Sequence, residues 1–143
     1  MAYTVKKTDV YCAEMDDQPG ALAAKLAPLA EAKVNLEFVF ARRQPDKPGK
    51  GIVFVAPIST SRSRKVAEAA GLVKAADLVA LRVDGADKPG EVARIAKCLG
   101  ANGINLRGVS AATIGKKFVV FLAFDNETDA GKAARLIRAG AKV

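Results

Sequence analysis

The chain has 143 residues, with 23 lysines and arginines against 15 aspartates and glutamates, so its formal net charge is +8. It contains no histidine, which excludes histidine general bases, Ser-His and Cys-His nucleophile pairs and histidine-ligated zinc. Two cysteines are too few for a structural zinc site. Most hydrolase and metalloenzyme classes are therefore excluded.

The composition is that of a globular protein, because half of the residues are apolar and 27% are charged. The longest unbroken apolar run, Phe118–Phe124, has seven residues, whereas a membrane helix needs roughly 20. No apolar segment follows the basic residues near the N-terminus, unlike a secretory signal. We therefore expect a cytoplasmic protein that does not contact a membrane and keeps Cys12 and Cys98 reduced.

The chain contains an internal repeat. Asp17–Leu22 (Asp-Gln-Pro-Gly-Ala-Leu) matches Asp87–Val92 (Asp-Lys-Pro-Gly-Glu-Val) at a shift of 70 residues, and the same shift aligns Asn35 with Asn105. Agreement over this length in one register indicates two copies of the same structural unit. We expect one domain over residues 1–74 and a second over residues 75–143.

In the first copy the elements are predicted in the order strand, helix, strand, strand, helix, strand. The strands are expected at residues 9–15, 34–41, 51–57 and Leu72–Ala75. The first helix opens at the Pro-Gly turn. Thr60 or Ser61 suits the N-cap of the second helix, and Gly71 suits its left-handed end.

The second copy predicts the same order, with strands at residues 78–84, 104–111, 117–124 and Ala141–Val143. Its second helix is expected to follow Asn126 or Thr128 and to end at Gly140. Each copy then makes a four-stranded antiparallel sheet with both helices on one face. The expected fold class is α+β, with two tandem ferredoxin-like βαββαβ units.

The third strand of each copy is apolar on both faces. In the second copy Phe118, Val120 and Leu122 alternate with Val119 and Phe121. A central strand can carry exposed apolar groups without a function. Because sizeable apolar patches usually mark interfaces, we expect instead that the sister repeat or another subunit covers this face, and that the protein forms a homo-oligomer, a dimer.

The repeated turn carries a family resemblance. Asp-x-Pro-Gly-x-Leu/Val between a strand and a helix, followed about 15 residues later by Val/Ile-Asn-Leu, resembles the ACT domain, and the resemblance covers nearly the whole chain in two copies. It implies a regulatory module that binds amino acids or related ligands, typically between two such domains, and controls a metabolic enzyme or a transcriptional regulator. The ligand-binding residues that it implies are Asp17, Gln18, Pro19, Gly20, Ala21, Leu22, Asn35 and Leu36 in the first copy, and Asp87, Lys88, Pro89, Gly90, Glu91, Val92, Asn105 and Leu106 in the second.

These residue types suit an amino-acid ligand. Free N–H groups at a helix start attract a carboxylate, and glycine allows close approach to the backbone. An asparagine side chain can donate to a carboxylate and accept from an ammonium group. Structural alternatives stay open, in which Asp17 and Asp87 cap their helices and Asn35 and Asn105 are turn residues.

The two loops differ in charge. Glu91 replaces Ala21 and adds a negative charge where a ligand carboxylate would bind, and Lys88, in place of Gln18, could offset it. Either copy could therefore be the better binder.

RNA binding is the alternative function, because RNA-recognition motifs share this element order and residues 116–124 are similar to their aromatic third strand. Phe118 and Phe121 point to opposite faces, and the third strand of the first copy offers only Phe54, so nucleic acid is not the expected partner. The chain has no glycine-rich phosphate loop and no nucleophile beside a base. We therefore predict a non-enzymatic regulator without metal or cofactor, which binds an amino acid and acts on a target enzyme or regulator.

Overall fold

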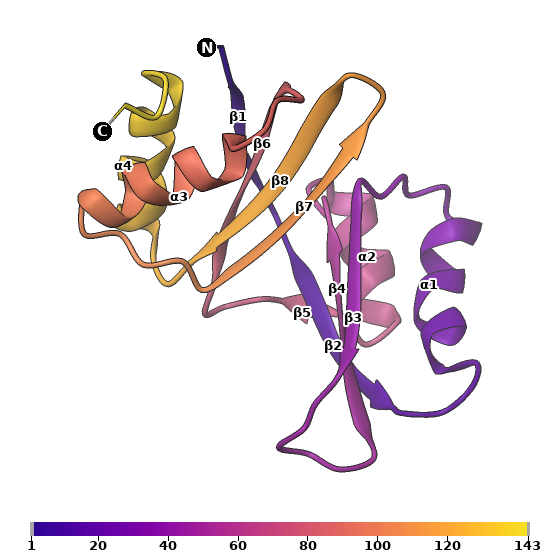
Figure 1. Ribbon diagram of the computed structural model, residues 1–143. Coiled ribbons are helices and arrows are strands. Elements are labelled where there is room, and N and C mark those ends of the chain that lie inside the picture. Colours follow the sequence, from indigo (N-terminus) through magenta and orange to yellow (C-terminus); the bar gives the residue numbers. More distant parts are fainter. Residues whose placement is uncertain (1, 143) are drawn as a thin grey trace. The chain divides into compact units, whose positions relative to one another are not determined.

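The computed structural model describes residues 2–142 (Figure 1). Its elements in chain order are β1 (Thr4–Thr8), β2 (Tyr11–Asp16), α1 (Ala21–Glu31), β3 (Phe38–Arg43), β4 (Lys50–Ala56), α2 (Ser61–Ala69), β5 (Val73–Lys74), β6 (Val79–Ala86), α3 (Glu91–Ala101), β7 (Gly108–Ile114), β8 (Lys117–Phe124) and α4 (Glu127–Arg138). The strands form two four-stranded sheets, in the orders β1-β6-β8-β7 and β3-β4-β2-β5. The predicted fold class, two ferredoxin-like units with antiparallel sheets, is confirmed.

The division of the chain differs from the two halves expected from the repeat. Thr8–Ala75 form one compact unit, here called the inserted unit, and the described residues on either side of it form the other, the outer unit. The expected boundary after residue 74 lies one residue from the observed one, but the residues before Thr8 do not join the first unit. Strand β1 is hydrogen-bonded to β6 instead.

The closing strand of the second copy is therefore not where the repeat predicts it. Ala141 and Lys142 are not in a strand, and Val143 lies outside the described residues. Strand β1 occupies the edge position beside β6 that such a strand would need. Ala141 is buried against the outer core, and its N–H donates to the carbonyl of Leu136 at 3.0 Å, so it ends α4. In the inserted unit β5 takes the equivalent place beside β2, as expected.

The second strand of each copy begins four residues later than predicted. Val34 and Leu36 lie outside a strand and pack against the inserted core. Pairing with the neighbouring strand starts at the N–H of Glu37, which donates to the carbonyl of Ala56 at 2.8 Å. The alternating apolar residues that predict a strand here, Val34 and Leu36, instead belong to a loop whose side chains pack against the core.

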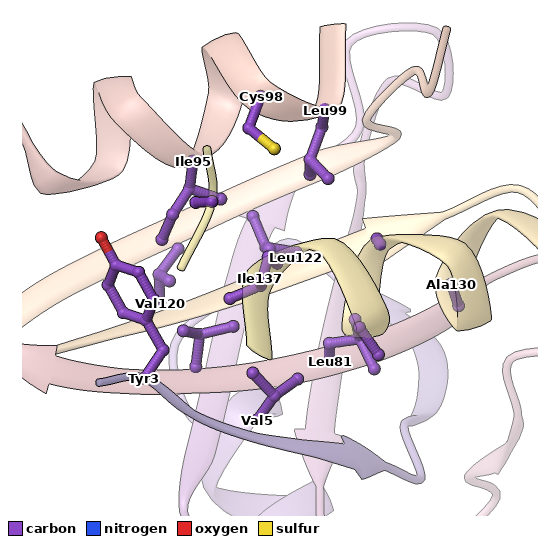
Figure 2. Packing of buried hydrophobic residues seen from close by; sticks show 14 of the residues in the cluster. Tyr3, Val5, Leu81, Ile95, Cys98, Leu99, Val120, Leu122, Ala130 and Ile137 are labelled. Carbon is purple, nitrogen blue, oxygen red and sulfur yellow. The ribbon is translucent and has the colours of Figure 1, made fainter. Parts of the chain in front are cut away.

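Both helices of each unit cover one face of its sheet (Figure 1). In the outer unit Ile95 and Leu99 of α3 and Ile137 of α4 are fully buried against the sheet (Figure 2). Among the predicted caps, Thr60 forms a capping box with Ser63, and the side chain of Asn126 accepts from the N–H of Asp129. Gly71 and Gly140 have the expected positive φ angles, 85° and 103°. Within residues 2–142 no helix is long and apolar enough to cross a membrane.

Candidate functional site

The predicted ligand loop of the outer unit connects β6 to α3. Its residues Asp87–Gly90 are all exposed. Gly90 is the N-cap of α3 with a φ of 85°, and no side chain hydrogen-bonds to this helix start. The alternative role of Asp87 as a helix cap is therefore wrong, and the N–H of Asp87 donates instead to the carbonyl of Lys116 at 3.0 Å. The loop is attached to the β7–β8 turn and leaves the start of α3 uncapped.

An open pocket of about 480 Å³ lies at this helix start. The loop and the first turn of α3 form one wall, and the end of β7 with a ring from β8 forms the other. The lining residues are Asp87, Lys88, Gly90, Glu91, Val92, Ala93, Ala111, Ala112, Thr113 and Phe118. Five of the six loop residues predicted for this copy thus line one pocket, and Pro89 does not.

Glu91 is the buried charged group of this pocket. Its side chain is only 8% exposed. Oε2 accepts a hydrogen bond from the hydroxyl of Tyr3 at 2.9 Å, and Oε1 lies 3.8 Å from Nη1 of Arg94. Burial, followed by the hydrogen bond to Glu91, raises the pKa of Tyr3 above its ordinary value. Tyr3 therefore stays a protonated donor at neutral pH and holds the carboxylate in place.

Tyr3 also anchors the floor of the pocket. Its ring meets the ring of Phe118 edge to face, with centroids 6.1 Å apart. Gly85 leaves room for this pair, since a Cβ there would lie 2.5 Å from Cε2 of Phe118 and 3.1 Å from Cδ1 of Tyr3. Figure 2 shows Tyr3 beside Ile95 in the outer core. The hydroxyl oxygen of Tyr3 lies at the edge of the cluster (Figure 2).

Sequence reasoning missed Tyr3 completely. It is 88 residues from Glu91 along the chain, and it has no counterpart in the repeat. The only signal for it in the sequence is that Tyr3 and Val5 are apolar residues two positions apart, as on one face of a strand.

The equivalent loop of the inserted unit has a different arrangement. Gly20 is the N-cap of α1 with a φ of 86°, no side chain caps the helix, and its first turn has no acidic residue. Asp17 is not a cap, because its Oδ2 pairs with Nε of Arg43 at 2.8 Å. Its neighbour Asp16 pairs with Lys50, which lowers the pKa of that carboxyl through the hydrogen bond from the ammonium group. The two acids of this loop are thus tied to the β3–β4 hairpin. The remaining predicted residues here are Gln18 and Pro19, both exposed, Ala21, half-buried, and Leu22, exposed.

The structure does not bring the asparagines to the loops within a unit. Asn35 and Asn105 are exposed and follow the C-terminal ends of α1 and α3. Each helix has 11 residues, so it separates the two ends by about 16 Å. Leu36 and Leu106, beside the asparagines, pack against the cores of their units. A ligand role for the asparagines stays a prediction.

An aromatic cluster in the inserted unit was also missed. Phe40 of β3 lies opposite Phe54 of β4, with ring centroids 6.5 Å apart, and stacks on Phe38 at the same distance. The aromatic count taken along the third strand alone found only Phe54, because the other two rings come from the neighbouring strand. Phe40 is 42% exposed.

No metal site accompanies these loops: among residues 2–142 no three histidine, cysteine, aspartate or glutamate side chains gather as metal ligands. Cys98 is buried and Cys12 half-buried. Both fit the packing role that free cysteines usually have.

Comparisons with known proteins add the family. Residues 79–139 match the ACT domain family model. In fold the chain is similar to a protein from Bacteroides thetaiotaomicron, with a TM-score of 0.76, 12% identity and coverage of 94% of this chain and 90% of that one. It is also similar to the ligand-free regulatory subunit of aspartate kinase from Thermus thermophilus, with a TM-score of 0.67, 14% identity and coverage of 99% and 98%.

A putative C-terminal regulatory domain of aspartate kinase from Porphyromonas gingivalis W83 has a TM-score of 0.56 to this chain, with 13% identity and coverage of 99% and 98%. At such identities these similarities establish the shared fold. No curated protein sequence matches the chain. The family match therefore identifies residues 79–139 as an ACT domain, and both units share the ferredoxin-like architecture that the repeat predicts.

Proposed function

We propose that this protein is a regulator that binds a small molecule, an amino acid, in the pocket at the start of α3. The observation that carries the proposal is that one pocket gathers five residues of the second ACT loop, among them Asp87, Lys88 and Glu91. Its volume of about 480 Å³ lies within the range of roughly 300 to 1,000 Å³ that is usual for small-molecule sites.

The charges of the pocket support a zwitterionic ligand. Carboxylates of Asp87 and Glu91 can accept from an ammonium group, and Lys88 can pair with a carboxylate. Val92 and Phe118 supply apolar surface for a side chain.

We propose that the ligand-bound protein modulates a separate target in the cytoplasm, an enzyme or a transcriptional regulator. The fold shared with a protein described as a regulatory subunit of aspartate kinase supports this type of role. We propose self-association as a dimer on the basis of the apolar faces of the third strands. Sedimentation velocity tests it, and a monomer whose sedimentation coefficient does not change with concentration would exclude it.

A thermal-shift screen against the standard amino acids tests the ligand. A ligand at 100 times its dissociation constant adds about 2.7 kcal/mol of stability, so a binder raises the melting temperature clearly. Ala93→Trp fills the pocket from an exposed position on α3, and Ala23→Trp makes the same change at the equivalent position of α1. We expect the first variant to lose the shift and the second to keep it. No shift with any amino acid would reject the proposal.

RNA binding remains the second candidate, favoured by the Phe38, Phe40 and Phe54 cluster. Aromatic rings on a sheet can stack with bases, and the net charge of +8 would attract phosphates. Titration with labelled single-stranded RNA at two salt concentrations separates the candidates. Tight binding that weakens steeply with salt, and that Phe40→Ala removes, would support RNA binding.

A further inference from the structure

The loop that lines the proposed pocket differs from the equivalent loop of the inserted unit at the first residue of its helix. Glu91 is the first residue of α3 and lines the pocket. Ala21 holds the same place in α1, where the first turn has no acidic residue. The family loop is therefore repeated with a carboxylate in one copy and a methyl group in the other.

The position of this carboxylate is fixed by the rest of the fold. Tyr3 donates to Oε2 at 2.9 Å, and the Glu91 side chain is 8% exposed. Arg94 is the neighbouring cation, with its Nη1 3.8 Å from Oε1 and its own side chain 42% exposed. The buried carboxylate of Glu91 thus lines the pocket, held by the neutral hydroxyl of Tyr3 and near the half-exposed guanidinium of Arg94.

A ligand carboxylate at the start of α3 would face this negative charge. Repulsion between two carboxylates at contact distance in a partly buried site exceeds the attraction of a helix start for an anion. An ammonium group at the same place would gain both the Coulomb attraction and a charge-assisted hydrogen bond. Asp87, which also lines the pocket, adds to the preference for a cation.

We propose, on the basis of the proposed function, that this pocket binds its ligand through the ammonium group. Glu91 is the residue that selects for the ammonium group, and Tyr3 is the positioning residue that holds it. The ligand carboxylate lies toward Lys88 and is dispensable. The chemical class that fits is a small primary amine, of which amino acids are one part.

Two probe sets made from the standard amino acids test this orientation. The α-amides keep the ammonium group and lack the carboxylate, and the N-acetyl derivatives have the reverse. At about pH 6.5 the α-amino groups are protonated. Both sets are titrated into the full chain while the amide NMR signals of Gly90–Ala93 and Ala111–Thr113 are followed. We expect amides to shift these signals and N-acetyl derivatives to leave them unchanged.

Glu91→Gln keeps an acceptor for Tyr3 and removes the charge, so we expect amides to bind at least tenfold more weakly. Glu68→Gln makes the same change at an exposed glutamate of α2, outside the predicted ligand loops, and should leave amide affinity unchanged. Tyr3→Phe should weaken amide binding in the wild-type background and have no further effect in Glu91→Gln, a coupling that a purely structural tyrosine would not produce. The amide NMR spectrum of each variant checks that it is folded.

The outcomes separate the two proposals. If intact amino acids and N-acetyl derivatives bind but amides do not, the orientation is wrong while the proposed function stands. If amides bind equally to wild type and Glu91→Gln, Glu91 is not the selecting residue and the inference is overturned. If no amino acid and no amide perturbs the pocket, the proposed function fails and this inference fails with it.

Discussion

The hydrogen bond from Tyr3 to Glu91 is the contact by which the N-terminal segment reaches the candidate site, and Tyr3→Phe measures its strength. Phenylalanine keeps the ring that meets Phe118 and removes only the hydroxyl. A hydrogen bond to a charged group contributes about 1.5–3 kcal/mol, and a buried acceptor left without its donor costs energy of similar size. We therefore expect the free energy of unfolding of the outer unit to fall by about 2 kcal/mol.

For a unit of this size each kcal/mol shifts the melting temperature by about 4–8 °C, so Tyr3→Phe should lower that of the outer unit by about 10 °C. Urea unfolding followed by circular dichroism gives the free energy, and hydrogen exchange assigns the loss to the outer unit. Tyr11→Phe is the control, because Tyr11 is buried in the inserted unit and makes no side-chain hydrogen bond among residues 2–142. The free energy of unfolding should fall clearly less for Tyr11→Phe than for Tyr3→Phe, because no side-chain hydrogen bond is removed.

The reasoning would be refuted if Tyr3→Phe were as stable as the wild type. It would also be refuted if the effects of Tyr3→Phe and Glu91→Ala were additive in the double variant, because two residues that share a hydrogen bond must couple.

Three further predictions concern stability. Gly85→Ala should destabilise the outer unit by about 1–3 kcal/mol, because the new Cβ overlaps the rings of the pocket floor; a urea midpoint equal to wild type would contradict this. Lys33 has a φ of 60° at the position that Gly103 holds in the other copy. Lys33→Gly should therefore raise the free energy of unfolding by about 0.5–1 kcal/mol in the same assay. A lower free energy of unfolding would show that contacts of the Lys33 side chain outweigh the relief of backbone strain. Arg82 holds the pKa of Asp84 below its ordinary value of 3.8 through a hydrogen bond; this stabilisation is complete above that value and is lost as pH falls through the lowered pKa, so Asp84→Asn should lose stability at neutral pH and show a flatter decline below about pH 4. A decline identical to that of the wild type would assign the acid sensitivity to other groups.

Much of the site is local in origin and could be predicted. The Pro-Gly loops, the Thr60 and Asn126 caps and the glycine after α2 are set by contacts within a few residues, and such short-range preferences can be read from spacing. The repeat of one pattern at a constant shift then identified the same unit twice, although no single copy would have been convincing.

The tertiary structure decided how these parts combine. Strand β1 joins the outer sheet and takes the place of the expected C-terminal strand, since strand pairing depends on which edge is free and not on sequence proximity. Because β1 pairs there, Tyr3 reaches Glu91 and the pocket gains its fixed carboxylate. An 11-residue helix separates each asparagine from its loop, a distance that no motif encodes. The sequence by itself determined the repeated loop pattern and the fold class, because these follow from local spacing. Only long-range packing decided which sheet β1 joins and how the carboxylate of Glu91 is held in the pocket.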